Sequence, residues 1–485
     1  MGNRRKPVAF LARAAVAVVV ASWVAVDLGG CPGRRPDVRD GGTGAADCVL
    51  GTPPRGRVDR KLLLFGIDGA TWSRIDLQLA RGELPNLRRL IEGGVRAPLR
   101  TMWPTLSPMI WTTIATGVGP MEHGILWFTT PVPGTGRSLL AGSNQRRAAA
   151  LWNILSAARF RVGVVGWWAT YPAEAVNGFV ISDQASSVRR RTFLALAKST
   201  STEPNRVLPG EVYPQALGDE LGEILHPQVA AEPELLRRFV DLPAEHLAKL
   251  QAETKVDTED VFSILQFSFL IDRAYVEAGL RAIAETRPDF AAVYFNGLDA
   301  AEHHFWKYIE SEHLPGVTPE EFARYGQAID RYYVYMDEVL GRYLALYPPG
   351  ASTVLVVSDH GMERNAFYDP ASKFQVHRVS SGTHDYAPDG IFVAWGRDIV
   401  PGATLSPRPT VLDVAPTVLA LMGLPAGENM GGRVLDAMLA QEFLAAHPPA
   451  RVCAYPPPVP PPLPPVDSRA NDDLVDRLRA LGYIR

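Results

Sequence analysis

The sequence predicts an α/β fold with a mostly parallel, doubly wound sheet flanked by helices. Short uninterrupted apolar runs recur along the chain, and such runs are typical of strands that a parallel sheet buries on both faces. Helix-like stretches separate the runs, which is the alternation that crossover connections produce. In such a sheet, ligands bind at the carboxyl ends of the strands, so functional residues are expected there.

The composition agrees with a globular domain and excludes several classes of function. The 485 residues are 47% apolar and 21% charged, and 49 basic against 52 acidic residues give a net charge of −3. Without a long basic run in the body of the chain, no binding of a nucleic-acid polymer is expected. Three cysteines are too few for a disulfide scaffold or a Cys₄ zinc module, so any metal must be held by Asp and His.

Residues 1–31 are predicted to be a signal peptide of the lipoprotein type. The start is basic, and the apolar run at 14–26 covers about 20 Å as a helix, whereas a spanning helix must cross about 30 Å of hydrocarbon. Leu28-Gly29-Gly30-Cys31 resembles a lipoprotein cleavage box. We therefore expect an exported protein tethered to a membrane by a lipid on Cys31, facing the periplasm or the cell exterior. Plain secretion and an uncleaved N-terminal anchor are the alternatives.

Lipidation of Cys31 would leave Cys48 and Cys453 as an even pair in an oxidising compartment, so a disulfide between them is a hypothesis. An unpaired Cys453 in the proline-rich tail is the alternative.

The catalytic domain is predicted at 59–445, after a flexible tether at 32–58 that is rich in Gly, Pro, Arg and Asp. The first strand is expected at Lys61–Ile67, and helices at 86–92 and 275–285. Further strands are expected at 162–167, 291–295, 353–357 and 391–395.

Three further segments complete the organisation. Residues 185–270 are polar, with several helix-like stretches, and predict a helical cap over the site; a surface insertion without a role is the alternative. A helix is expected at 412–422. Residues 446–466 are rich in proline, which favours a stiff, extended spacer over a partner-binding segment, and 467–485 are expected to close the chain with an amphipathic helix.

Asp and His residues gather where the predicted strands end. An Asp after a strand is a common turn or cap residue, and a lone His is usually no ligand. The joint occurrence at several strand ends is harder to explain in this way. Two of these residues, Asp299 and His303, are also spaced to share one face of a helix. The residues concerned are Asp68, Asp299, His303, Asp359, His360 and His384.

A run of hydroxyl residues lies before a helix-like stretch. Ser107-Pro108 followed by apolar residues suits the start of a helix, where free N–H groups and the dipole favour an anion. Local reasoning does not choose between Thr105, Ser107 and Thr112 as a reactive group. Thr112, together with Thr113 and Thr116, is most simply explained by packing within the helix.

The order of five motifs resembles the alkaline phosphatase superfamily, and within it the type I phosphodiesterase/nucleotide pyrophosphatase family. The resemblance runs from Lys61 to Leu435 and implies an alkaline phosphatase-like fold. The motifs are FGIDGATW, PTLSPMIWTTIATG with GPMEHGI, NGLDAAEHHFW, VVSDHGM and GTHDYAPDGIF.

The resemblance implies two Zn²⁺ per chain, or other divalent ions. Asp299, His303 and His384 would hold one ion, and Asp68, Asp359, His360 and the nucleophile Ser107 the other. Thr105 is the second candidate for the nucleophile. His123 matches a family position without a metal role and is expected to be structural, whereas His304 has no assigned role and would face solvent or a neighbouring helix.

The charge balance agrees with this ligand set. Three aspartates contribute −3 against +4 from two divalent ions, which leaves about +1 to favour ionisation of the serine without a separate catalytic triad. The implied reaction passes through a phosphoserine.

The expected function is hydrolysis of a small phosphate ester or nucleotide-like substrate, with a phosphodiester or pyrophosphate bond preferred. Pro108-Met109-Ile110-Trp111 replaces the Phe-Pro-Asn-His common in the family and leaves nucleotide preference open. Trp103, Trp111 and Trp127 are candidates for an ester pocket, although packing is their simpler role. Transfer of a phospho-headgroup to a lipid or glycan, phosphomonoesterase activity and a non-catalytic surface lipoprotein are the alternatives. A sulfatase is disfavoured because the C/S-x-P-x-R context is missing.

Overall fold

The computed structural model describes most of the chain from residue 58 to residue 459. The predicted signal peptide, the tether up to residue 57, Cys31, Cys48 and the closing helix at 467–485 lie outside the described residues. Among the helices that were described, none combines the length and the apolar character needed to cross a bilayer. The described ranges are 58–132, 137–188, 207–226, 233–253, 256–310, 315–386 and 388–459.

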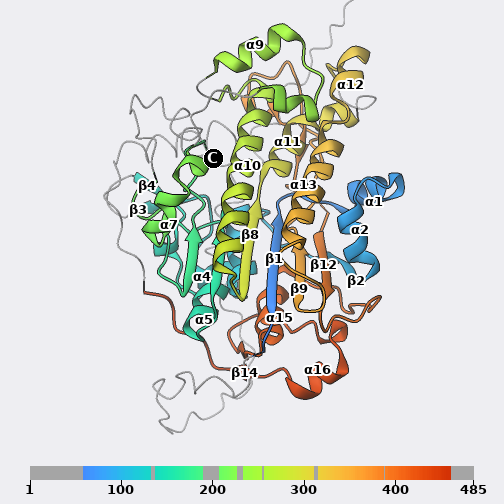
Figure 1. Ribbon diagram of the computed structural model, residues 1–485. Helices are drawn as coiled ribbons and strands as arrows, with labels where there is room; N and C mark the ends of the chain where they lie inside the picture. The colour runs from blue at the N-terminus through green and yellow to red at the C-terminus, as the bar shows by residue number, and fades with distance from the viewer. Residues whose placement is uncertain are drawn as a thin grey trace, which may run out of the picture. The chain divides into compact units, whose positions relative to one another are not determined.

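A mixed sheet of eight strands forms the centre of this part of the chain, in the order β2-β12-β9-β1-β8-β5-β6-β7 (Figure 1). The five strands from β9 to β6 are parallel neighbours, which confirms the mostly parallel sheet. The strands are β1 (Lys61–Ile67), β2 (Gly94–Leu99), β5 (Val162–Val165), β6 (Gly178–Ile181), β7 (Val212–Tyr213), β8 (Phe290–Phe295), β9 (Ser352–Val357) and β12 (Gly390–Gly396).

The predicted strand at 391–395, which is β12, runs antiparallel to its neighbours in the sheet. β12 is buried like its neighbours but pairs antiparallel with both β9 and β2. The start of β12, rather than its end, therefore lies at the edge where the parallel strands finish. This reversal brings the loop before β12, which carries His384, to the same edge as the residues that follow β1, β8 and β9.

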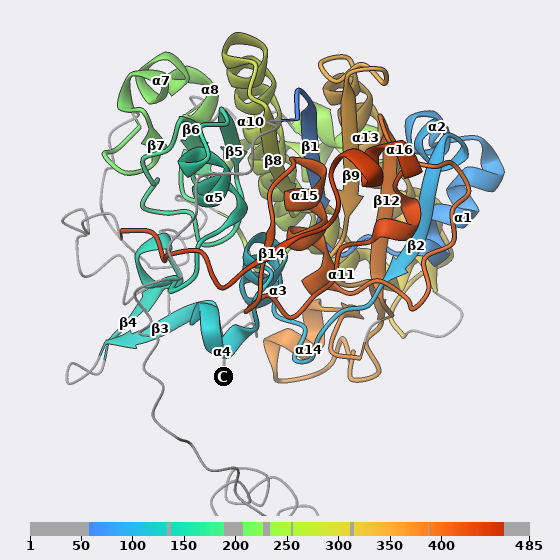
Figure 2. The same ribbon diagram turned by 90° about the horizontal axis from the view of Figure 1, so that it is seen from below.

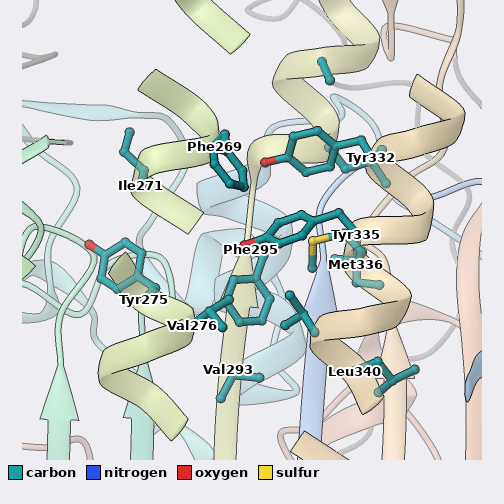
Figure 3. Packing of buried hydrophobic residues seen from close by; sticks show 14 of the residues in the cluster. Phe269, Ile271, Tyr275, Val276, Val293, Phe295, Tyr332, Tyr335, Met336 and Leu340 are labelled. Atoms are coloured by element: carbon teal, nitrogen blue, oxygen red, sulfur yellow. The ribbon is translucent and has the colours of Figure 1, made fainter. Parts of the chain in front are cut away.

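Two hydrophobic cores cover the two faces of the sheet. Leu63 and Phe65 of β1 point into one core, with α10 (Val261–Thr286) and α13 (Ala328–Leu344). Figure 3 shows side chains of α10, β8 and α13 meeting in this core. Leu62 and Leu64 point into the other core. The period of two along β1 thus supplies both layers, as a strand buried on both faces requires.

The second core is covered by α3 (Ser107–Thr116), α5 (Leu151–Ala157) and α15 (Val414–Leu421), which Figure 2 shows on the side facing the viewer. The remaining helices of more than one turn are α1 (Trp72–Arg81), α2 (Pro85–Glu92), α7 (Gln215–Glu220), α9 (Ala244–Ala252), α11 (Gly297–Ile309), α12 (Pro319–Tyr325), α14 (Gln375–Val379) and α16 (Gln441–Ala446). One-turn helices are α4 (Pro120–His123) and α8 (Gly222–Leu225). Short strand pairs are β3 (Thr129–Val132) with β4 (Arg137–Leu140), β10 (Glu363–Arg364) with β11 (Gly382–Thr383), and β13 (Ala426–Gly427) with β14 (Arg451–Val452).

The predicted insertion at 185–270 is mostly helical where it is described, and it is anchored in the first core. It contains α7, α8 and α9, and several of its leucines are buried with α10. The long helix α10 already begins at Val261, so the insertion ends earlier than the composition suggested. The role of this segment as a cap stays a prediction.

The start of the predicted proline-rich spacer is attached to the domain. Arg451 and Val452 form β14, which pairs with β13, and the Tyr455 hydroxyl donates to the carbonyl of Pro425. Cys453 is disulfide-bonded. Because Cys31 and Cys48 lie outside the described residues, the pairing of Cys48 with Cys453 stays a prediction.

Candidate metal centre and active site

The carboxyl edge of the sheet collects the Asp and His residues that the sequence singled out. Adjacent strands β9, β1 and β8 deliver Asp359 and His360, Asp68, and the start of α11, respectively. α11 carries Asp299 and His303 one turn apart, with Nε2 of His303 3.6 Å from Oδ1 of Asp299. The i, i+4 spacing therefore places both side chains on one helix face, as expected.

The structure brings these residues into two overlapping groups. Possible ligand atoms of Asp299, His303 and His384 all lie within 4.8 Å of one another, and so do those of Asp68, Asp299 and His360. The first group is the predicted set for one ion. In the second group, Asp299 is close enough to contribute to both sites.

Asp359, the remaining residue of the predicted second set, lies next to His360. Its Oδ2 lies 3.3 Å from Nε2 of His360, and the same nitrogen lies 3.4 Å from Oδ1 of Asp68. The carboxylates of Asp68 and Asp359 therefore both lie next to Nε2 of His360.

Backbone carbonyls orient two of the three histidines. Nδ1 of His303 donates to the carbonyl of Gly382, and Nδ1 of His360 donates to that of Gly361, each at 3.0 Å. A carbonyl only accepts, so the proton is on Nδ1 and the lone pair is on Nε2. A histidine fixed in this way is typical of a metal ligand.

Thr105 orients the third histidine. Its hydroxyl donates to the carbonyl oxygen of His384 at 2.6 Å, so its oxygen is left to accept from Nδ1 of the same residue at 3.2 Å. His384 consequently also directs an Nε2 lone pair outward. The hydroxyl of Thr105, the second candidate for the nucleophile, thus makes both of its hydrogen bonds with His384.

The donor set fits divalent cations. Buried polar groups without partners are costly and rare in native proteins, and a cluster of them that offers only O and N lone pairs is what zinc and similar ions require. Buried atoms of the cluster that lack a hydrogen-bond partner in the described part of the chain are Oδ1 of Asp68, Oδ1 of Asp299, both carboxylate oxygens of Asp359 and Nε2 of His360.

The directions of the pKa shifts in the cluster also indicate a site for cations. Burial raises the pKa of Asp299 and of Asp359, and repulsion from Asp68 raises both further. Burial lowers the pKa of all three histidines, which keeps them neutral and able to coordinate. The carboxylates are therefore stable as anions only beside compensating positive charge, and two divalent cations would supply it.

Ser107 is the first residue of α3, and a residue on each side of it in the sequence contacts the cluster. Two residues before it, Thr105 holds His384; four residues after it, the Trp111 indole donates to Oδ2 of Asp68 at 3.1 Å. Ser107 is buried, and its hydroxyl makes no hydrogen bond within the described residues. Because Thr105 and Trp111 contact predicted ligands, we expect Ser107, the first residue of α3, to lie near the cluster.

The other threonines of α3 are structural, as expected. The hydroxyls of Thr112, Thr113 and Thr116 each donate to the carbonyl four residues back. Trp111 is fully buried, and Trp127 is partly buried against the second core. Of the three tryptophans considered for an ester pocket, Trp103 is the most exposed.

The two remaining buried histidines near the site are packed into the fold. His123 accepts from the backbone N–H of Ile125 at Nδ1, so Nε2 donates to the Thr113 hydroxyl. Burial lowers the pKa of His123 to about 3, which agrees with the expected structural role. His304 is buried and donates to the carbonyl of Val379 in α14, so it faces a neighbouring helix.

Sequence reasoning missed a fourth buried carboxylate, Glu302. Its Oε1 accepts from the Tyr333 hydroxyl at 3.0 Å, and that hydroxyl accepts from the backbone N–H of Thr71, in the loop after Asp68. Its Oε2 faces Gly69, where a β-carbon would lie 3.0 Å away. Glu302 therefore ties α11 to the loop that presents Asp68. Its i+3 spacing from Asp299 is the signal that could have revealed it.

Two strongly exposed aromatic side chains lie on the loops that bear site residues. Thr105 contacts His384, and the backbone N–H of Thr101 donates to Asp389 at 3.4 Å, so the two segments run side by side. Between these contacts lie Trp103, which is 76% exposed, and Tyr386, which is 79% exposed. Trp103 and Tyr386, which we call the aromatic rim, are thus two residues from Thr105 and His384, respectively, on neighbouring loops.

Comparison with solved structures finds similar chains of low identity. A phosphonoacetate hydrolase from Sinorhizobium meliloti 1021, in complex with phosphonoformate, is 20% identical at a TM-score of 0.35, covering 65% of this chain and 59% of its own. The same enzyme in complex with phosphonoacetate is 19% identical at a TM-score of 0.35, covering 64% of this chain and 58% of its own. This chain thus spans less than two thirds of their length. A mutant of alkaline phosphatase PafA is 13% identical at a TM-score of 0.47, covering 79% of this chain and 99% of its own.

No curated protein sequence matches the chain significantly. The family described as type I phosphodiesterase / nucleotide pyrophosphatase does match, over residues 62–393, which is more than half of the chain and includes all six Asp and His residues of the cluster. The resemblance found in the motifs is confirmed: the chain belongs to the type I phosphodiesterase / nucleotide pyrophosphatase family.

Proposed function

We propose that the chain is an exported, metal-dependent hydrolase of small phosphodiesters or pyrophosphates, with Ser107 as its nucleophile. The observation that carries the proposal is the buried cluster of three aspartates and three oriented histidines next to the start of α3. Family membership supports hydrolysis of phosphate esters. Export and the lipid tether rest on the sequence of residues 1–31.

The residues assigned to the two ions are Asp299, His303 and His384 for one, and Asp68, Asp359, His360 and Ser107 for the other. We propose zinc because imidazole nitrogens and carboxylate oxygens suit it. When bound, two such ions would polarise the phosphoryl group and lower the pKa of a coordinated hydroxyl.

In the proposed reaction, the oxygen of Ser107 forms a bond to phosphorus while the bond from phosphorus to the leaving oxygen breaks. The serine proton passes to solvent, and the leaving alcohol or phosphate takes up a proton on release. Water then attacks phosphorus of the phosphoserine, which regenerates the serine hydroxyl. The free N–H groups at the start of α3 are available to bind the phosphoryl oxygens throughout.

The proposed diester preference rests on the sequence motifs, in which no residue clearly supplies the additional cationic group that a monoester dianion would favour. The exposed rim of Trp103 and Tyr386 instead offers flat apolar surface to an ester group. Transfer to a lipid or glycan acceptor uses the same phosphoserine and is the alternative.

A comparison of four substrates after zinc loading tests the proposal. We expect kcat/KM to be highest for bis-p-nitrophenyl phosphate or a nucleotide ester, lower for p-nitrophenyl phosphate, and negligible for p-nitrophenyl sulfate. Ser107→Ala is the matched control for contaminating activity. Equal or better turnover of the monoester would overturn the diester preference, and absence of turnover on every phosphate ester would overturn the hydrolase itself.

A further inference from the structure

A polar pocket lies at the opposite end of the sheet from the Asp and His cluster. It has a volume of about 260 Å³ and is found where β1, β8, β5 and β6 begin. Since β1 and β8 are six to seven residues long, the pocket is about 20 Å from the cluster. Its lining residues, which define the amino-end pocket, are Lys61, Arg159, Arg161, Asn177, Arg287 and Asp289.

The amino-end pocket has an excess of positive charge. Four cationic side chains face one carboxylate. Asp289 already accepts from Nζ of Lys61 at 3.3 Å and from the backbone N–H of Arg161 at 2.9 Å. The Arg161 guanidinium donates to the carbonyl of Thr286 at 2.8 Å. Three positive charges are therefore left without a matching carboxylate in the lining.

Arg159 and Arg287 carry two of these three unmatched positive charges. Neither guanidinium makes a hydrogen bond or ion pair within the described part of the chain, and the side chains of both residues are exposed. A guanidinium offers five N–H donors in a flat fork that matches the oxygens of a phosphate group. Two guanidinium groups in the lining of one pocket are suited to a compact polyanion.

The backbone at these two arginines gives an independent argument. Arg159 has φ of 67° and Arg287 φ of 48°, in the left-handed region that follows a helix and ordinarily favours glycine. Only four non-glycine residues of the described chain have positive φ, and two of them line this one pocket. An arginine at such a position also offsets the negative end of its helix dipole. That role needs one cation per helix end and does not require the two side chains to share a pocket.

We propose that the amino-end pocket binds a phosphate group, with Arg159 and Arg287 as its principal donors. The group could belong to a free phosphate or to the headgroup of an anionic phospholipid, since both present the same oxygens. Residue 58, the first described residue, lies at this end of the domain, just before β1. The inference does not depend on the proposed function of the metal cluster.

The test uses Arg159→Gly combined with Arg287→Gly in the zinc-loaded full chain. Glycine suits the left-handed backbone, so we expect the double variant to fold with an unchanged or higher Tm. Equilibrium dialysis with radioactive phosphate should find one bound phosphate fewer per chain, or a dissociation constant for that site raised by about tenfold to a hundredfold. Arg88→Gln combined with Arg324→Gln removes the same charge elsewhere and should bind phosphate like the wild type.

Two further readings locate the binding and its source. Inhibition of ester hydrolysis by phosphate should be the same in the wild type and the double glycine variant, because the metal cluster is untouched. Cosedimentation with phosphatidylglycerol vesicles, against phosphatidylcholine vesicles, should weaken in the variant if the pocket takes a headgroup. A change in phosphate dialysis alone assigns a free anion. Identical phosphate stoichiometry and identical vesicle binding in variant and wild type would overturn the proposal.

Discussion

Replacing Thr105 with valine separates its role as a support of His384 from a role as nucleophile. Valine keeps the shape of threonine but removes the hydroxyl that accepts from Nδ1 of His384 and donates to its carbonyl. Both groups of His384 would be left unsatisfied in a buried site, at about 1–3 kcal/mol each. Loss of a partner that orients a metal ligand typically weakens metal binding by about tenfold to a hundredfold.

The assay is competition for zinc between the protein and a chromophoric chelator, fitted to two sites. We expect Thr105→Val to weaken one site within that range and to leave the other unchanged, with turnover recovering as zinc is raised. Thr112→Val is the matched control, because its hydroxyl bonds only the carbonyl of Pro108 in its own helix. Wild-type affinity at both sites would refute the positioning role. Full zinc occupancy without turnover would make Thr105 the nucleophile.

Three further predictions concern the nucleophile, pH dependence and the aromatic rim. Ser107→Ala should lower kcat by about a thousandfold or more with two ions still bound, and near-wild-type activity would exclude it as nucleophile. His123 has its pKa lowered by burial from 6.5 to about 3, so the unfolded chain binds a proton that the folded chain does not, and stability falls as pH drops from about 6.5 towards 3. His123→Gln should reduce that slope by about 1.4 kcal/mol per pH unit in denaturant titrations between pH 6 and 4, whereas an unchanged slope would contradict the argument. Trp103→Ala should lower kcat/KM for the bis-p-nitrophenyl ester about tenfold more than for p-nitrophenyl phosphate, and equal losses would remove the rim from substrate binding.

The central strands could be predicted because burial on both faces leaves a clear signal. The run at Lys61–Ile67 coincides with β1, and the runs at 291–295 and 353–357 fall within one residue of β8 and β9. β2 was missed because it lies at the sheet edge, where Arg96 and Pro98 interrupt the apolar pattern. The antiparallel direction of β12 was not predictable, since strand direction depends on the connection and not on the residues of the strand.

The candidate site was predictable to the extent that its residues follow strands or share a helix turn. The family motifs located all six Asp and His residues, and the structure places them together. The supporting contacts of Thr105 and Trp111 join segments far apart in the chain, so no local pattern could reveal them, whereas the spacing of Glu302 from Asp299 could have marked that residue. Their roles follow only from the tertiary arrangement.

The most direct test of the two-ion centre is anomalous diffraction from crystals of the zinc-loaded chain. We expect two zinc peaks per chain, one bounded by Asp299, His303 and His384 and the other by Asp68, Asp359 and His360. Peaks elsewhere, or a well-folded crystal that takes up no zinc between these side chains, would contradict the account.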